Sequence, residues 1–340
     1  MPIISIIILN WNSGKYLEYC CQALRDQSFR DFEVICIDNG SSDISLTWLK
    51  KTNLKDFIGS ETTLIYNNEN VGFAEGMNQG IRKSKGKLII PLNVDVFLEN
   101  NFLENIVQIS ENFPNISVFG ANIFKYDPKL NSKTDEQLCT AVFPNKHMSL
   151  FTKLPFNFDE KIVFGPAGCC PIYRKEMLDA VAIPKEISGE QLQYFDSNYF
   201  AYGEDVDLYW RMNILGYQAL YCEKLRAWHV HSGTQSGVRW WQKNSKTIFR
   251  ITANAYATWL KNMYGKSFWI VGFYMLFMPY LMFFTLLLKA PKKCLAPILA
   301  YYRMISYLPY NIKLRYFFMS HKKISEQQQL LILNNKYFIC

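Results

Sequence analysis

The segment Leu88-Ile89-Ile90-Pro91-Leu92-Asn93-Val94-Asp95 indicates the fold class of this chain, because an apolar run passes directly into polar residues. A short apolar run bounded in this way is typical of a strand buried on both faces, as in a parallel sheet. Residues that follow such a strand lie at its carboxyl end, where ligands of open α/β sheets gather. Alternation places Asn93 and Asp95 on one side of the chain. The stretch predicts a buried strand with a ligand site at its end.

The same pattern repeats through the first third of the chain. Short apolar runs alternate with segments of helical spacing, which predicts a parallel sheet wrapped by helices. The expected strands are residues 3–9, 33–38, 63–66 and 87–92. The expected helices are residues 15–26, 43–50, 72–84 and 101–112. The predicted fold class is therefore α/β, a sheet flanked by helices.

The middle of the chain is less regular. Residues 119–164 contain proline-punctuated polar segments, which predict loops or small accessory strands. We expect a strand at 169–173, a helix that begins at Glu204 and stops at Gly216, and a strand at 218–222. These elements complete a predicted catalytic domain over residues 1–240.

Residues 241–340 differ in composition, being aromatic, basic and apolar. Residues 267–288 are uncharged and strongly apolar, and about 20 such residues suffice to cross a bilayer. Both flanks are basic, so the positive-inside rule gives no orientation, and Pro279 fits a kinked span or a re-entrant hairpin. We expect a helical, membrane-associating region, either peripheral or with one span.

Composition narrows the possible partners. The chain has 340 residues, 49% of them hydrophobic, and a formal net charge of +8, which suits a nucleotide diphosphate, a phospholipid surface or a nucleic acid. A nucleic-acid interface needs an exposed basic stripe with interleaved aromatics, whereas much of the basic excess surrounds the apolar C-terminal run. Nine cysteines without a Cys-x-x-Cys motif predict reduced thiols. Residues 2–9 lack the basic start of a leader peptide, so we interpret them as a strand.

Asp38 ends a second predicted strand and opens the turn Asn39-Gly40-Ser41-Ser42-Asp43. At that edge its carboxylate is placed to accept hydrogen bonds from a base or a ribose. The alternative is a helix-capping turn, for which this composition is common.

Residues 70–80 place glycines and amides at the start of a predicted helix. Small residues at a helix N-terminus allow backbone amides to bind phosphate. Gly76 and Gly80 lie one turn apart, so close helix packing is an alternative explanation for both.

Asn93 and Asp95 offer oxygen ligands to a hard cation. Mg²⁺ or Mn²⁺ at this place would bridge two phosphates of a donor and neutralise the leaving group. An isolated Asn-x-Asp is more often only a turn.

Glu204, Asp205 and Asp207 lie together at the start of a predicted helix. Acidic residues there are often simply partners of the helix dipole. The same dipole keeps a carboxylate ionised, which a general base for a sugar hydroxyl requires. Asp205 is the candidate base, and Glu204 would help to place the acceptor.

His229 and His231 are two of only four histidines. Alternate strand positions face one side, which allows both imidazoles into one site, although a packed polar histidine is the alternative. A zinc hydrolase is disfavoured, because His-x-x-x-His and a third nearby ligand are missing.

The segments 6–12, 37–43, 70–74, 92–95, 165–169 and 202–208 follow one another in an order that resembles the family 2 glycosyltransferases, the inverting GT-A group, and within it the bacterial rhamnosyltransferase-like branch. The resemblance implies a Rossmann-like mixed sheet flanked by helices, with a nucleotide-sugar site and a metal site. It assigns nucleotide-sugar binding to Asn10, Asn12, Asp38, Asn70, Gly72, Phe73, Asn78 and Asn93. It assigns the metal, Mg²⁺ or Mn²⁺, to Asp95 and His229, with His231 as a second choice.

The neutral Asn93 departs from the Asp-x-Asp pattern of these enzymes, so the cation would hold one fewer charged ligand and bind mostly through donor phosphates. The resemblance implies that Asp205 deprotonates the acceptor, which displaces the nucleotide and inverts the anomeric carbon. The implied donor is dTDP-rhamnose or a UDP-sugar. The implied acceptor is a lipid-linked or polysaccharide glycan, such as O-antigen, at the cytoplasmic face of the cell membrane. The alternative is a non-catalytic, membrane-associated carbohydrate-binding protein that retains the fold.

Overall fold

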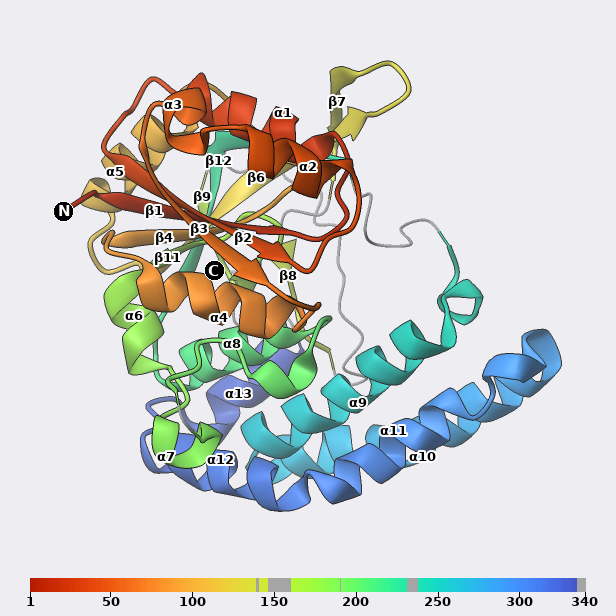
Figure 1. Ribbon diagram of the computed structural model, residues 1–340. Helices are drawn as coiled ribbons and strands as arrows, with labels where there is room; N and C mark the ends of the chain where they lie inside the picture. Colours follow the sequence, from red (N-terminus) through yellow and green to blue (C-terminus); the bar gives the residue numbers. More distant parts are fainter. Residues whose placement is uncertain (139–140, 146–159, 190, 231–237, 335–340) are drawn as a thin grey trace. The chain divides into compact units, whose positions relative to one another are not determined.

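A computed structural model describes residues 1–138, 141–145, 160–189, 191–230 and 238–334 (Figure 1). Their contacts divide the chain into two compact units. The first holds the described residues of 1–142, 152–182 and 218–232, and the second holds those of 143–151, 183–217 and 233–340. Residues 183–217 thus group with the C-terminal helices in this division. The domain boundary at residue 240 stays a prediction.

The first unit is built on a mixed sheet in which the strand order is β3-β2-β1-β4-β11-β6-β12-β5, with β7 paired to β6 and β9 to β12. Its strands are β1 (Ile4–Asn10), β2 (Phe32–Asn39), β3 (Glu61–Asn67), β4 (Leu88–Asn93), β5 (Val96–Leu98), β6 (Val118–Asp127), β7 (Ser132–Gln137), β9 (Glu160–Val163), β11 (Ile172–Arg174) and β12 (Ala219–His229). A separate pair joins β8 (Ala141–Val142) to β10 (Gly165–Pro166). Its helices are α1 (Tyr16–Arg25), α2 (Ile44–Lys51), α3 (Leu54–Ile58), α4 (Phe73–Lys83), α5 (Phe102–Asn112) and α6 (Lys175–Ala180).

The four parallel strands expected from the sequence are confirmed. β1 pairs in parallel with both β2 and β4, and β2 pairs in parallel with β3. The predicted helices between them are present as α1, α2, α4 and α5, and the short α3 precedes β3 in addition. Asp43 caps α2 by accepting a hydrogen bond from the Ser45 amide, as the Ser-Ser-Asp turn predicted.

Strand β1 shows why the sheet is covered on both faces. Ile4, Ile6 and Ile8 belong to the core that also holds the buried residues of α1. On the opposite face, Leu9 and Ile7 lie against Gly76 and Gly80 of α4. An added Cβ would come within 2.5 Å of Leu9 at Gly76 and within 2.3 Å of Ile7 at Gly80. Both glycines therefore serve close helix packing, which was one of the two expectations for this segment.

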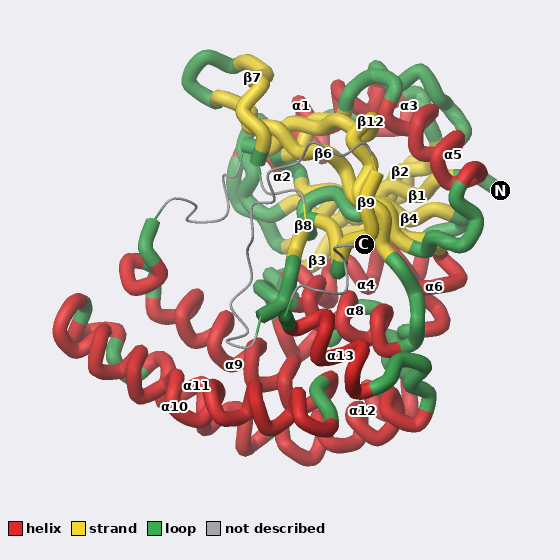
Figure 2. The backbone as a smooth tube through the Cα atoms, turned by 180° about the vertical axis from the view of Figure 1, so that it is seen from behind, coloured by secondary structure: helices red, strands yellow, loops and turns green. Residues whose placement is uncertain are grey.

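The second half of the first unit differs most from expectation. The region expected to be irregular contains β6, whose first six residues are buried, and Figure 2 shows it beside β12. The strand expected at 218–222 and residues 227–229 belong to a single strand, which begins at Ala219. β12 runs through both, and its register along β6 shifts between Cys222 and Arg226. Glu223 and Lys224, which are exposed inside this irregularity, interrupt the apolar pattern. For that reason the sequence pattern predicts only the first part of the strand.

The second unit is helical. It contains α7 (Lys185–Ser188), η1 (Ser197–Tyr199), α8 (Glu204–Ile214), η2 (Trp240–Gln242), α9 (Ser245–Asn262), α10 (Gly265–Lys289), η3 (Pro291–Lys293), α11 (Ala296–Ser306), α12 (Leu308–Ser320) and α13 (Glu326–Leu333). α8 begins and ends close to its predicted bounds. α10 is one continuous helix through Pro279, so the re-entrant hairpin is wrong.

By length and composition, α10 is able to cross a membrane, with a mean hydropathy of 2.0 in its apolar window. Only 28% of that window is buried. A core helix of a soluble protein passes the same test of length and composition, so the helix by itself does not fix a location.

Candidate active site

Asp95 and His229 meet at one edge of the sheet. Asp95 lies in the turn between β4 and β5, and His229 ends β12, which pairs antiparallel with β5. The Val230 amide donates to the Asp95 carbonyl oxygen at 3.0 Å and fixes the two segments together. The His229 Nε2 atom lies 3.2 Å from Asp95 Oδ1, and both side chains are buried. The structure therefore brings together the two residues that the sequence assigned to one metal site.

The charge state of His229 follows from this setting. Burial opposes the charged ring, but the neighbouring Cys169 and Asp95 outweigh it and raise the pKa of His229 to about 10. Cys169 belongs to the 165–169 motif, and its carbonyl oxygen accepts from the Asn93 amide at 2.9 Å. Asn93 is the last residue of β4, and its backbone thus contacts the 165–169 segment, whose Cys169 neighbours His229.

Asp95 and His229 fit a divalent cation only in part. Among the described residues, no group of three or more His, Cys, Asp or Glu side chains could hold a metal ion. His231 lies outside the described residues. Once the cation displaces the ring proton of His229, one carboxylate and one imidazole would suit a cation that takes its other ligands from donor phosphates and water, which is common for Mg²⁺.

Asn10 and Asp38 form a buried cluster at the ends of β1 and β2. The Asn10 Nδ2 atom donates to Asp38 Oδ1 at 2.7 Å and lies within hydrogen-bond distance of the Ser41 and Ser45 hydroxyls. The second Asp38 oxygen accepts from the Ser41 amide at 3.1 Å. Asp38 is 2% exposed, so its buried carboxylate stabilises the turn that follows β2. Asn12 is exposed at the same edge and accepts from the Ser42 amide at 2.8 Å.

The turn before α4 is tied to β2 by amide side chains. Asn39 Nδ2 donates to Asn70 Oδ1 at 3.1 Å and to the Gly72 carbonyl at 3.2 Å. Asn70 in turn accepts from the Gly72 amide at 2.9 Å. Gly72 has a φ of 92°, which favours glycine there. Asn39 was not predicted as a site residue from the sequence, although it directly follows Asp38 in the 37–43 segment.

The remaining two candidates on α4 differ in exposure. Phe73, at the start of the helix, is partly exposed, whereas Asn78 is fully buried. Contact of Asn78 with a nucleotide sugar stays a prediction, and its burial favours a role inside the fold.

Glu204 and Asp205 open α8, which belongs to the second unit. Burial and the neighbouring Asp205 raise the pKa of Glu204 to about 8. Burial also raises the pKa of Asp205 to about 6, against a hydrogen bond from the Val206 amide at 2.8 Å. Burial therefore works against the helix dipole, which was expected to keep these carboxylates ionised. Asp205 remains mostly ionised at neutral pH and is suited to accept a proton.

Asp207, the third acid of this segment, is structural. Its fully buried carboxylate contacts Lys261 at 2.9 Å and Arg211 at 3.1 Å. Burial alone would raise the pKa of Asp207, but these two cations lower it overall. Lys261 also contacts Asp196 at 2.6 Å. Lys261 was not predicted, because a lysine in a basic region gives no signal of burial.

The comparisons with known proteins agree with this architecture. Residues 5–182 match the profile of the family described as Glycosyl transferase family 2. An uncharacterized glycosyltransferase of Haemophilus influenzae is 23% identical over 237 residues, which cover 70% of this chain and 68% of the relative. Glycosyltransferase GlyG of Streptococcus pneumoniae is 27% identical over 125 residues, 37% of this chain and 40% of the relative.

Two solved structures share the GT-A fold. The structure of residues 1–349 of S. aureus TarS in complex with UDP superposes with a TM-score of 0.53 at 12% identity, covering 96% of this chain and 93% of TarS. The structure of GalNAc-T7 with UDP, GalNAc and Mn²⁺ gives a TM-score of 0.55 at 15% identity, covering 75% of this chain and 47% of that one. The fold and the family match over more than half of the sequence lead to one conclusion. The chain is a glycosyltransferase and belongs to glycosyl transferase family 2.

Proposed function

We propose that this protein is an inverting glycosyltransferase that moves a sugar from a nucleotide-sugar donor to a lipid-linked or polysaccharide acceptor in cell-surface glycan synthesis. The convergence of Asp95 and His229 at the carboxyl end of β4 carries the proposal, because it joins two segments far apart in the sequence at the edge where ligands of such sheets bind. The UDP held by both solved neighbours supports a nucleotide donor. A rhamnosyl or other deoxysugar donor is a narrower form of the same proposal.

The reaction assigns one role to each candidate residue. Asp205 accepts the proton of an acceptor hydroxyl, whose oxygen bonds to the anomeric carbon while the nucleoside diphosphate leaves from the opposite side. Glu204, whose raised pKa favours its protonated form, orients the acceptor. Asn12, Asn70 and Phe73 bind the donor. Asp95 and His229 would hold Mg²⁺ or Mn²⁺, which would supply charge neutralisation for the departing diphosphate.

The membrane is the proposed place of action. The apolar and basic composition of the second unit suits the cytoplasmic face of the cell membrane, as a peripheral protein or with α10 as a single span.

A thermal-shift screen of sugar nucleotides with Mn²⁺ or Mg²⁺ tests the proposal, since a ligand that binds the folded state raises the apparent stability. We expect one donor to raise the melting temperature in the presence of metal and then to release its nucleoside diphosphate when acceptor is added. Binding without turnover across all donors and membrane acceptors would instead support a carbohydrate-binding protein.

A further inference from the structure

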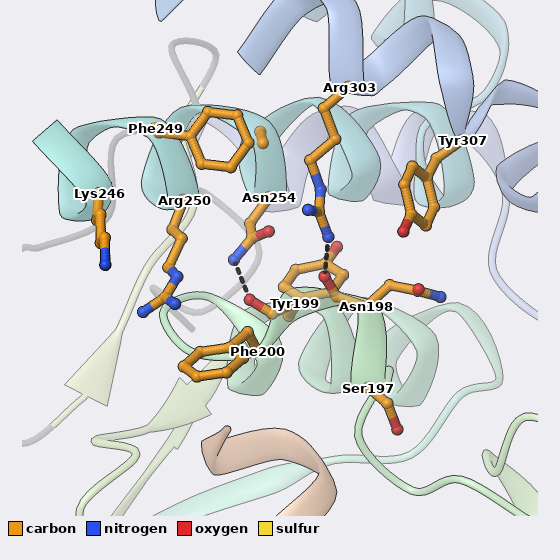
Figure 3. A pocket seen from close by; sticks show the side chains of 11 residues that line it. Ser197, Asn198, Tyr199, Phe200, Lys246, Phe249, Arg250, Asn254, Arg303 and Tyr307 are labelled. Carbon is orange, nitrogen blue, oxygen red and sulfur yellow. Dashed lines mark hydrogen bonds between the residues drawn. The ribbon is translucent and has the colours of Figure 1, made fainter. Parts of the chain in front are cut away.

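The second unit contains a pocket of about 370 Å³ lined by α9, α11 and residues 197–200 (Figure 3). Three cations, Lys246, Arg250 and Arg303, line it together with aromatic rings, and none of its described lining residues is acidic. Figure 3 shows Lys246 and Arg250 extending from α9 and Arg303 reaching in from α11. A pocket of this composition selects an anion.

The two guanidinium groups are held in place without a counter-ion. Arg250 lies 3.8 Å from the centre of the Phe200 ring, and Arg303 lies 4.7 Å from that of Tyr307. Arg303 also donates to the Asn198 carbonyl oxygen at 2.6 Å, which uses one of its five N–H groups. In the part of the chain that the structure describes, no carboxylate forms an ion pair with any of the three cations. Arginines held in this way are suited to bind phosphate oxygens.

The helix that supplies Arg303 also presents apolar side chains to the outside. On α11, Leu299 is 55% exposed and Tyr302 is 65% exposed. α10 packs against α11 and exposes further large apolar residues. These are Trp269, Ile270, Phe273, Leu276, Phe277, Tyr280, Leu281, Phe284, Leu287 and Leu288. A ligand that joins a phosphate to a long hydrocarbon chain matches both features.

The pocket is tied to the segment that precedes the candidate base. The buried Asn254 amide donates to the carbonyl oxygens of Tyr199, Ala201 and Tyr202 at 3.1, 3.0 and 2.7 Å. Phe200 and Tyr202 have positive φ angles of 60° and 75°, so the segment is held in an uncommon conformation. It leads directly into Glu204 and Asp205. A group bound in the pocket therefore contacts the segment that leads into the proposed base, Asp205.

We propose that this pocket binds the phosphate group of a lipid phosphate, the carrier of the sugar acceptor, with the hydrocarbon chain along the exposed faces of α10 and α11. The assignment of the lipid as acceptor carrier rests on the proposed function. Arg250 and Arg303 contact the phosphate, and Lys246 adds to its attraction.

Binding of dodecyl phosphate to the full-length protein in neutral detergent tests the pocket, with dodecanol and sodium pyrophosphate as separate arms. We expect dodecyl phosphate to bind at least about tenfold more tightly than either, because charge-assisted hydrogen bonds and the apolar chain act together. The double variant Arg250→Gln/Arg303→Gln should lose about tenfold or more of that affinity. Lys313→Gln removes an exposed charge outside the pocket and should bind as the unaltered protein does.

Three outcomes would overturn the proposal. If dodecanol binds as tightly as dodecyl phosphate, the phosphate group is not recognised. If pyrophosphate binds as tightly or more tightly, the hydrocarbon chain is not recognised. If the double variant binds dodecyl phosphate as the unaltered protein does, the ligand does not bind in this pocket. If the double variant fails to fold, Lys246→Gln at an exposed position replaces it, with an expected loss of about threefold.

The pocket and the proposed function fail separately. Release of nucleoside diphosphate from a donor with water as acceptor does not need the lipid. Lipid-phosphate binding without any donor turnover would support the pocket and contradict the proposed sugar transfer. Donor turnover without lipid-phosphate binding would support the sugar transfer and contradict the pocket.

Discussion

Asp205 is the residue on which the proposed chemistry depends most. We expect Asp205→Asn to lower the transfer rate by about 10²–10⁴-fold, because the amide cannot accept the acceptor proton. Binding of the donor, measured by thermal shift, should change little. Glu186→Gln neutralises an exposed acid of the same unit and serves as the control. Transfer by Asp205→Asn at the rate of the control would remove Asp205 as the base.

The pH dependence of transfer follows from the same carboxyl group. Burial raises the pKa of Asp205 to about 6, and the base works only when deprotonated. The rate should therefore fall about tenfold per pH unit below 6 and level off above it. A profile of kcat between pH 4.5 and 7.5 measures this, and a rate that stays flat across that range would contradict the assignment.

At the scale of elements, α4 packs closely on β1. We expect Gly80→Ala to reduce the free energy of unfolding by about 1–3 kcal/mol, because the new methyl group would meet Ile7 at 2.3 Å. Denaturant unfolding measures the loss. Lys83→Ala, at an exposed position of the same helix, should change stability by less than about 0.5 kcal/mol. If Gly80→Ala has the same free energy of unfolding as the unaltered protein, the close packing of α4 on β1 does not contribute to stability.

A buried ion network connects α8 to α9. Replacing Lys261 by Met leaves the Asp196 and Asp207 carboxylates buried without their shared cation, and we expect a loss of about 3–5 kcal/mol. The ion pairs lower the pKa of Asp207, so its contribution to stability is present at neutral pH and is lost as the pH falls through that lowered pKa. Thermal unfolding of Lys261→Met across pH, beside Lys313→Met, measures both effects. Equal stability of the two variants would contradict the network's role.

At the scale of the whole molecule, the exposed side of α10 predicts membrane association. Phe277 and Leu281 are 54% and 70% exposed. Converting both to Glu should lower sedimentation with anionic vesicles by more than about tenfold, since each loses its apolar contact with lipid. Gln191→Glu/Gln327→Glu adds the same charge at exposed positions outside α10 and should sediment as the unaltered protein does. Equal sedimentation of both double variants would remove α10 as the contact.

Local sequence patterns predicted the parallel half of the sheet, its covering helices and the bounds of α8. These elements follow from local patterns of apolar residues, glycine and capping side chains, which act over a few residues. Asp38 and Asp95 were singled out because each comes at the end of a predicted strand, and His229 because it alternates with His231.

Features that depend on residues far apart in the chain became visible only in the folded protein. It showed that residues 219–229 form one strand along β6, that Asp95 contacts His229, and that burial raises the pKa of Glu204. It also showed that Lys261 is buried and that Arg250 and Arg303 line one pocket. Burial and charge neutralisation depend on what packs around a side chain, and neighbours brought together by folding leave no local pattern in the sequence.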